Sequence, residues 1–210
     1  TRATAMLRQH AHTAERYAPL KLKSNNMHQS IEFETERLIL RPINKNDAES
    51  VFRYRSDAIT NQFQGWIPKN INEVQDFIKN RVSPTINVAE TWFQFVIVSK
   101  VKEEIIGDFG LHFYDKENKQ VEIGCTIDKK FQRNGFATEA IIVIMRYLFN
   151  TLNKYRIVES IDPRNINSIR LVKKLKFRKE AHFIENIMSN GVWTDDLIYA
   201  ILKKEWISNK

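Results

Sequence analysis

The sequence predicts a mixed α/β domain in which strands and helices alternate along most of the 210 residues. The β-branched run 121–127 leads through a short loop into a segment with helical periodicity, which is a strand–turn–helix pattern. Near the C-terminus, two apolar runs, 177–187 and 192–202, flank Ser189-Asn190-Gly191, and Asn-Gly is a favoured two-residue turn of a β-hairpin. A hydrophobic share of 42% supplies enough apolar material for a core.

Before residue 90, the pattern predicts one strand over 33–41, followed by helices over 47–54 and 71–82. Pro42 is expected to end the strand, because proline has no N–H to donate to a sheet ladder. Asn70 or Asn72 is expected to cap the second helix, since an asparagine side chain accepts hydrogen bonds from the free N–H groups of a first turn.

The central part of the chain predicts further strands and a helix. Segments 92–98 and 105–113 are an outgoing and a returning strand around the charged turn Lys102-Glu103-Glu104, and 121–127 follows them. After Gly135, apolar residues recur at three- and four-residue spacing, which predicts a helical stripe. These residues are Ile141, Ile144, Met145 and Leu148.

Cysteine and apolar content restrict the class of protein. The single cysteine, Cys125, excludes an intrachain disulfide and fits a reducing compartment, so a cytoplasmic location is expected. No run of about 18 apolar residues appears, so no membrane partner is expected. His10 and His12 have no further ligands around them, and no metal site is expected.

The net charge of +8 is unevenly distributed. Residues 1–26 hold five basic residues and one acid, which leaves the rest of the chain at +4 and makes nucleic-acid binding an unfavoured reading. The same residues show no sustained apolar period, so we read them as a leader or disordered extension, with an Arg-rich targeting segment as the alternative. Residues 27–210 are then expected to form a single domain.

The turn between the strand 121–127 and the following helix has the features of a phosphate site. Gly135 permits backbone conformations closed to other residues, and Ala137 leaves the backbone approachable. Free N–H groups and the positive end of the helix dipole meet at such a turn, which favours a pyrophosphate. The alternative is an ordinary strand–turn–helix connection with an incidental glycine.

Two spaced segments, and the start of the domain, resemble one known family. QRNGFATEA, from Gln132 to Ala140, resembles the acyl-CoA pyrophosphate motif of the GNAT acetyltransferase superfamily. DPRNINSIRLVKKLKF, from Asp162 to Phe177, is similar to a later helix of that family, with matches at Asn165, Ser168, Leu171 and Phe177. TERLILRP, from residue 35 to residue 42, resembles the opening strand of the Rim-type ribosomal-protein alanine N-acetyltransferases.

The resemblance implies a central mixed, mostly antiparallel sheet of about seven strands flanked by about four helices. It also implies a splay between the fourth strand, 121–127, and the fifth, 155–161, where acetyl-CoA would bind as acyl donor. The residues implied for the cofactor are Cys125, Thr126, Ile127, Gln132, Arg133, Asn134, Gly135, Phe136, Ala137, Thr138, Asn165 and Lys174.

The chain departs from the family pattern at two positions. Val172 stands where the family commonly has the tyrosine that protonates the leaving thiolate, and Lys176 replaces the glycine of a Gly-Phe pair. The second change is expected to alter only a helix cap. The first removes the usual general acid and leaves the hydroxyl of Ser168 as a candidate donor, unless Ser168 is merely a helix cap.

The remaining catalytic and acceptor residues are candidates with structural alternatives. Glu122, on the central strand, is the candidate general base, unless it pairs with a basic residue or faces solvent, and Asp108 is the second candidate. A buried strand cysteine is usually inert, so direct transfer is favoured over a Cys125 intermediate. Phe63 and Trp66 are candidates for the acceptor site, unless they anchor their loop to the core.

The sequence thus predicts an acetyl-CoA-dependent N-acetyltransferase acting on a primary amine, either a protein N-terminus or a small molecule. Two alternatives stay open: a CoA-binding module without catalysis, and a basic protein that associates with ribosomes or RNA. Neither the acceptor nor the oligomeric state, for which a homodimer is one option, follows from the sequence.

Overall fold

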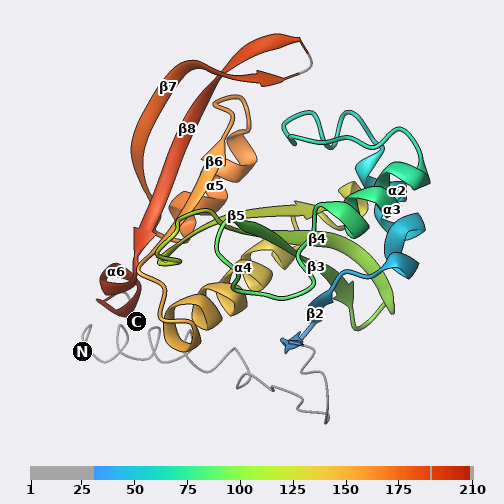
Figure 1. Ribbon diagram of the computed structural model, residues 1–210, viewed down its shortest axis with the longest axis horizontal. Coiled ribbons are helices and arrows are strands. Elements are labelled where there is room, and N and C mark those ends of the chain that lie inside the picture. The colour runs from blue at the N-terminus through green and yellow to red at the C-terminus, as the bar shows by residue number, and fades with distance from the viewer. Residues whose placement is uncertain (1–30, 190, 209–210) are drawn as a thin grey trace, which may run out of the picture.

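The computed structural model describes residues 31–189 and 191–208, and the expected leader, 1–26, lies outside them. One mixed sheet forms the centre of the molecule, with helices against both faces (Figure 1). Its eight strands run in the spatial order β1-β2-β3-β4-β5-β6-β8-β7, and only the β5–β6 pair is parallel. The strands are β1 (Phe33–Glu34), β2 (Leu38–Pro42), β3 (Thr91–Ser99), β4 (Glu104–Phe113), β5 (Gln120–Ile127), β6 (Arg156–Ile161), β7 (Arg178–Ser189) and β8 (Val192–Leu202).

The prediction of one continuous strand over 33–41 is wrong. It is two short strands, β1 and β2, that pair with each other in antiparallel register, and this raises the count from about seven to eight. Thr35 turns the chain: its N–H donates to the carbonyl of Leu38, and its Oγ1 accepts from the N–H of Leu38. A hydroxyl that bonds the backbone locally competes with the strand ladder, which explains the break.

The helices divide between the two faces of the sheet. On one face, α2 (Ala48–Arg55) and α3 (Ile71–Asn80) pack in a small apolar cluster that includes Val96 of β3. On the other face, α4 (Phe136–Arg146) and α5 (Ile166–Lys174) join a larger cluster that includes Phe95 of the same strand. The alternation along β3 follows from the two-residue period of a strand.

Helix signals in the sequence agree with the structure in most places. Asn70, rather than Asn72, caps α3 by accepting a hydrogen bond from the N–H of Glu73 at 3.0 Å. The predicted apolar stripe of α4 is fully buried and continues into a π-helical segment, Tyr147–Thr151. A further short α-helix, α6 (Lys203–Ser208), was not predicted and brings Trp206 against the larger cluster. In the described part of the chain, no helix is long and apolar enough to cross a membrane.

Strands β5 and β6 separate after three residue pairs. Gln120 pairs with Arg156, and the last pair joins Glu122 to Val158, after which both strands continue without further pairing to each other. The expected splay between the fourth and fifth predicted strands therefore lies between β5 and β6. It leaves one backbone edge of β5, from residue 123 to residue 127, open toward β6.

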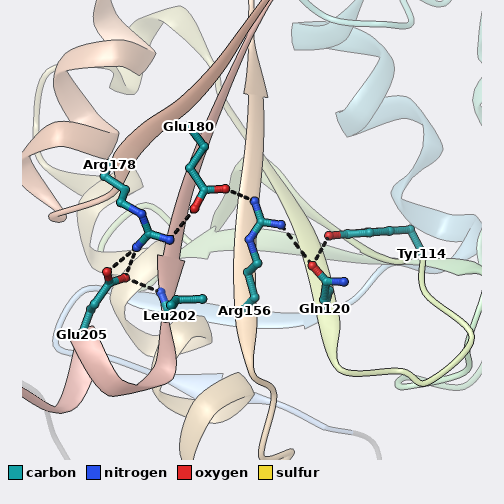
Figure 2. Close-up of polar contacts among 7 residues, drawn as sticks. All are labelled: Tyr114, Gln120, Arg156, Arg178, Glu180, Leu202 and Glu205. Carbon is teal, nitrogen blue, oxygen red and sulfur yellow. Dashed lines mark hydrogen bonds and ion pairs between the residues drawn. The ribbon is translucent and has the colours of Figure 1, made fainter.

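A chain of polar contacts fastens the paired end of these strands (Figure 2). Gln120 accepts hydrogen bonds from Tyr114 and Arg156, each at 3.0 Å. Arg156 also forms an ion pair with Glu180, which pairs in turn with Arg178, linking β5 and β6 to β7. Arg178 reaches Glu205 of α6, whose carboxylate accepts from the N–H of Leu202 at 2.7 Å. The contacts hold the strands together at one end, while the other end stays open.

The β7–β8 hairpin extends beyond the rest of the sheet (Figure 1). It turns through Gly191, whose φ of 79° glycine adopts without strain, whereas Asn190 of the predicted Asn-Gly turn lies outside the described residues. The loop that follows α2 lies at the same end of the molecule, so the open end of the β5–β6 splay is flanked by this loop and the hairpin.

Candidate active site

A cavity of about 410 Å³ lies at the open end of the splay. Its walls come from the loop after α2, from β5 and β6, from the start of α5 and from the β7–β8 hairpin. Four carboxylates line it, and none of the lining residues is Lys, Arg or His; the carboxylates belong to Glu122, Glu159, Asp162 and Asp195. Other lining residues are Phe63, Trp66, Trp92, Gly124, Cys125, Asn165 and Ser168.

Three of the four carboxylates have a basic partner that stands outside the cavity lining. Glu122 lies 3.2 Å from Nδ1 of His112, and Asp195 lies 2.7 Å from Nε2 of His182. Asp162 forms an ion pair with Arg164 at 2.6 Å, and the hydrogen bond from Arg164 lowers the pKa of Asp162. These partners orient the three carboxylates.

Glu159 differs from the other three. Its side chain is buried, and among the described residues no hydrogen bond or ion pair joins its carboxyl group to another residue. Burial, together with the negative charge of Glu122, raises the pKa of Glu159 to about 8. A carboxyl group with this pKa is largely protonated at neutral pH.

Glu122, the predicted base, is placed at the last paired residue of β5 and lines the cavity. The imidazole of its partner His112 stacks on Trp92, with ring centroids 4.5 Å apart. The predicted alternative, pairing with a basic residue, is therefore present, yet the carboxylate is still about a third exposed. The structure shows this pairing, and the role of Glu122 as a base stays a prediction.

Asp108, the second predicted candidate, does not line the cavity. Its side chain is 2% exposed and forms an ion pair with Arg55 at 2.5 Å. It also accepts hydrogen bonds from Tyr54 and Gln94, each at 2.6 Å. A carboxylate held by three partners beneath the sheet stabilises the fold and is not available to an acceptor.

Cys125 stands on the open edge of β5 and lines the cavity. Burial, with the nearby charges of Asp108 and Glu159, raises the pKa of its thiol well above its usual value. A thiol rather than a thiolate is a poor nucleophile, which agrees with the expectation of direct transfer.

The predicted pyrophosphate turn has an unusual backbone. Arg133 and Gly135 have φ values of 64° and 82°, and Gly135 is the N-cap of α4 with no side chain bonded to the first turn. Asn134 closes the loop by donating its side-chain amide to the carbonyls of Phe131 and Gln132. The first N–H groups of α4 therefore point outward, as an anion site requires.

Arg37 holds this turn from the other side. Its Nη1 donates to the carbonyl of Asn134 at 3.0 Å, and its guanidinium lies 4.5 Å from the ring centre of Phe136. An ion pair at 2.6 Å joins it to Glu139, which also accepts a hydrogen bond from Thr35. The opening strands of the domain thus fix the start of α4.

The remaining residues of the expected cofactor set occupy different environments. Ile127 accepts a hydrogen bond from the side chain of Gln132 at 2.9 Å, and Thr126 is buried, with its hydroxyl 3.3 Å from Nη2 of Arg55. Ala137 and Thr138 follow Phe136 in the first turn of α4 and are half-buried. Lys174 is exposed in the last turn of α5 and does not line the cavity.

The start of α5 forms one wall of the cavity. Asn165 is the N-cap and accepts from the N–H of Ser168 at 3.2 Å, so Ser168 is not itself the cap. Val172 is fully buried in the larger apolar cluster and offers no proton. Lys176 follows the helix with a φ of 67°, the left-handed conformation that glycine usually supplies at the end of a helix.

The aromatic loop after α2 both anchors itself and lines the cavity. Trp66 stacks on Phe77 of α3, with ring centroids 4.5 Å apart, and packs against the smaller cluster. Phe63 lies under the guanidinium of Arg164, 5.7 Å from ring centre to Cζ, and so links the loop to the segment after β6. Trp66 therefore anchors the loop to the smaller cluster, whereas Phe63 contacts Arg164, and both rings line the cavity.

This geometry is matched by known proteins. A sequence profile described as "Acetyltransferase (GNAT) domain" matches residues 37–178, about two thirds of the chain. The chain belongs to the GNAT acetyltransferase family. The protein is therefore an N-acetyltransferase, and its family uses acetyl-CoA as the acyl donor.

Relatives of this GNAT enzyme include bacterial acetyltransferases. It is 30% identical over 173 residues to "Uncharacterized N-acetyltransferase p20" of Bacillus licheniformis, covering 82% of this chain and 96% of the relative. It is 30% identical over 84 residues to the [ribosomal protein uS5]-alanine N-acetyltransferase of Escherichia coli, covering 40% and 43%. A GNAT acetyltransferase structure from Bacillus anthracis superposes with a TM-score of 0.73 at 25% identity, covering 83% and 99%.

Sequence reasoning missed one carboxylate of this GNAT site. Glu159 falls in the β-rich run Arg156 to Ile161, where a lone acid among apolar neighbours was the available signal. For Asp195 and Asp196 on the second strand of the hairpin, the sequence left open whether they attract a cationic acceptor or are solvated edge charges. Asp195 lines the cavity, whereas Asp196 is buried and accepts a hydrogen bond from Ser160.

Proposed function

We propose that the protein transfers the acetyl group of acetyl-CoA directly to a primary amine that approaches the cavity as an ammonium ion. The supporting observation is the cavity lining, with four acidic side chains, of which only Glu159 is favoured as the neutral acid, and no basic side chain in a chain of net charge +8. A cleft lined by one sign of charge concentrates ligands of the opposite sign. The proposal covers the N-terminal α-amine of a protein and a small-molecule amine.

The pyrophosphate of CoA is proposed to bind at the turn from Gln132 to Thr138. The uncapped first turn of α4 and the left-handed Gly135 support this placement, because they expose backbone N–H groups at the positive end of a helix. Arg37 places a cation against the same turn. Lys174, exposed on α5, is proposed to meet the 3′-phosphate.

The pantetheine arm is proposed to pair with the open edge of β5, from Cys125 to Ile127, in place of the missing β6 partner. Backbone N–H groups at that edge would polarise the thioester carbonyl as it becomes an oxyanion. Asn165 and Ser168 stand on the opposite wall of the cavity, and Phe63 and Trp66 flank its acceptor side.

Glu122 is proposed as the base that takes a proton from the amine. Its partner His112, 3.2 Å away, offers a route by which the proton returns to solvent. A free α-amine has a pKa of about 7.7–8.0 and needs little help at neutral pH, whereas a lysine amine, at about 10.4, needs a strong base. The partial match to a ribosomal-protein alanine N-acetyltransferase supports testing peptide N-termini first.

A non-catalytic CoA-binding role is the second candidate, and Val172 favours it because a valine cannot donate a proton. The two roles separate in assays. Both predict acetyl-CoA binding, but only the enzyme releases free CoA thiol when peptides, polyamines or other amines are supplied.

The first test is calorimetric titration of acetyl-CoA into the full chain and into Gly135→Glu. The wild type is expected to bind at about micromolar affinity, and the variant to lose binding because it places bulk and negative charge in the turn. Gly191→Glu is a matched control, since Gly191 also has a positive φ and its site is open. No binding to the wild type, or equal binding to both variants, contradicts the proposal.

A further inference from the structure

The buried carboxyl of Glu159 occupies a specific place in the splay. It follows Val158, the last residue of β6 that pairs with β5, and lines the cavity beside the open β5 edge. It is 8% exposed, and within the described residues it has no hydrogen-bonding or ionic partner. Because an ionised carboxylate without a partner is costly to bury, this position favours the neutral acid.

The groups around Glu159 also favour the neutral form. Strand β5 presents the carboxylate of Glu122 and the thiol of Cys125, and both are close enough to interact electrostatically with Glu159. On β8, Tyr199 is its cross-strand neighbour, and Asp195 lines the same cavity. The lining contributes no cation that would hold a charged carboxylate in place. These surroundings keep the pKa of Glu159 at about 8.

Acetyl transfer benefits from an acid at this place. The departing group is a thiolate, and the residue at the usual family position of the donor, Val172, has no proton to give. We infer that Glu159, held as the neutral acid, donates its proton to the sulfur of CoA, while Glu122 takes the proton of the amine. The inference rests on the proposed function, because it needs the thioester in the splay.

The proton transfers balance across one turnover. The neutral amine nitrogen forms a bond to the thioester carbon, and the electron pair of the C–S bond leaves with sulfur. Nitrogen gives one proton to Glu122, and sulfur takes one from Glu159. Glu122 is then neutral and Glu159 is ionised, so passage of one proton from Glu122 to Glu159 restores the pair.

The two carboxyls are suited to opposite roles because their environments differ. Glu122 is partly exposed beside His112, whereas Glu159 is buried and has no partner among the described residues. Pairs of carboxyl groups whose surroundings separate their pKa values commonly divide into an acid and a base. A thiol has a pKa of about 8.5, so an acid whose pKa is about 8 transfers its proton nearly without cost.

The first experiment is a carbon-13 NMR titration of the full chain labelled at the glutamate carboxyls. A signal that titrates near pH 8 is expected in the wild type and absent in Glu159→Gln. In Glu122→Gln, the same signal should titrate at lower pH, because one negative neighbour is gone. Titration of Glu159 in the ordinary carboxyl range overturns the inference, and this readout needs no acceptor.

The second experiment uses kinetics with acetyl-CoA and hydroxylamine, an amine that is already neutral at pH 7. Glu122→Gln should also lower the turnover number with this acceptor, because the nitrogen still gives up one proton after it attacks, whereas no proton has to be removed before the attack. Glu159→Gln should lose about 100- to 10,000-fold in turnover number, with little change in KM for acetyl-CoA. Ser168→Ala tests the other candidate donor and should lose less turnover number than Glu159→Gln, and Asp76→Asn, exposed on α3 and outside the cavity, is the control that should retain activity.

The outcomes separate the two proposals. Wild-type protein that fails to bind acetyl-CoA contradicts the proposed function. Wild-type protein that binds and turns over, with Glu159→Gln equally active, overturns only the role of Glu159. A larger loss in Ser168→Ala than in Glu159→Gln also overturns it and assigns the proton to Ser168. Glutamine has the shape of the neutral acid, so the variant is expected to fold.

Discussion

Arg55 of α2 and Asp108 of β4 form a buried ion pair beneath the open edge of β5. Nη2 of Arg55 lies 2.5 Å from Oδ1 of Asp108, and Nε lies 2.7 Å from Oδ2. The two side chains are 12% and 2% exposed, and the same guanidinium reaches the hydroxyl of Thr126 on β5. The pair therefore ties a helix to two strands that position the cavity.

Removal of the Asp108 charge is expected to destabilise the fold. Asp108→Asn leaves the Arg55 guanidinium buried without its counter-charge, which typically lowers the free energy of unfolding by about 3–5 kcal/mol. Urea unfolding measures this change. Asp76→Asn, exposed on α3, is the control and should stay within about 0.5 kcal/mol of wild type. If Asp108→Asn is as stable as the control but inactive, Asp108 has a role in the reaction, as its place as second candidate base predicted.

Lys176 offers a route to a more stable protein. It holds a φ of 67° just after α5, and its N–H donates to the carbonyl of Lys173. A side chain in this conformation costs about 1 kcal/mol relative to glycine, so Lys176→Gly should raise the melting temperature by several degrees. Lys176→Ala, which keeps a Cβ, should not. Equal melting temperatures for the two variants would show that the backbone is not strained there.

The sequence allowed prediction of those parts of the fold that have a local cause. The strand–turn–helix around Gly135 and the C-terminal hairpin were predicted because turn residues and apolar periods mark them directly. The split of the first strand was missed because threonine is equally common in continuous strands. The sequence does not show that the hydroxyl of Thr35 accepts a hydrogen bond from the N–H of Leu38. Local propensity does not distinguish a continuous strand from two strands separated by a turn. The hydrogen bond from Thr35 to Glu139 forms only when two distant segments come together in the folded chain.

The candidate site was predictable where a motif carries it. The turn from Gln132 to Ala137 matched a family pattern, and Glu122 lay on a strand whose register places it in the cavity. The environments of Asp108 and Glu159 could not be predicted from the sequence. Both are acidic residues within β-rich runs, but Asp108 forms an ion pair with Arg55, whereas Glu159 lines the cavity. That difference comes from contacts between distant segments, which a sequence pattern does not encode.

Glu159 should make stability depend on pH. Its pKa is raised from 4.5 to about 8, so the folded state holds the proton more tightly than the unfolded state. This contribution is fully present below pH 4.5 and is lost as the pH rises through 8. Glu159→Gln removes the dependence, so its advantage over wild type should grow with pH, by an amount on the order of a few kcal/mol by pH 9.

Urea unfolding of wild type and Glu159→Gln at pH 5, 7 and 9 measures this difference. Glu185→Gln, on the exposed part of β7, is a control that removes a solvent-exposed carboxylate. Parallel stability curves for wild type and Glu159→Gln would mean that Glu159 is ionised in the folded protein. That result would contradict the inference that Glu159 is a neutral acid in the folded protein.

Asp195 tests whether the cavity attracts a cation. Its carboxylate lines the cavity, and hydrogen bonds from the N–H of Glu185 and from His182 lower its pKa and keep it charged. Asp195→Asn retains an oxygen that can accept from Glu185 but removes the charge. The KM for a cationic acceptor should rise about threefold to tenfold, because one attractive charge is gone while the reacting groups stay in place.

The salt dependence of this KM separates charge from shape. Raising the ionic strength screens exposed charges, so the gap between wild type and Asp195→Asn should narrow with salt. The KM for acetyl-CoA should be the same in both proteins, and Asp76→Asn should behave as wild type throughout. An unchanged acceptor KM in Asp195→Asn would indicate that the amine binds without help from the hairpin. An increase that persists at high salt would indicate that the substitution distorts the hairpin instead.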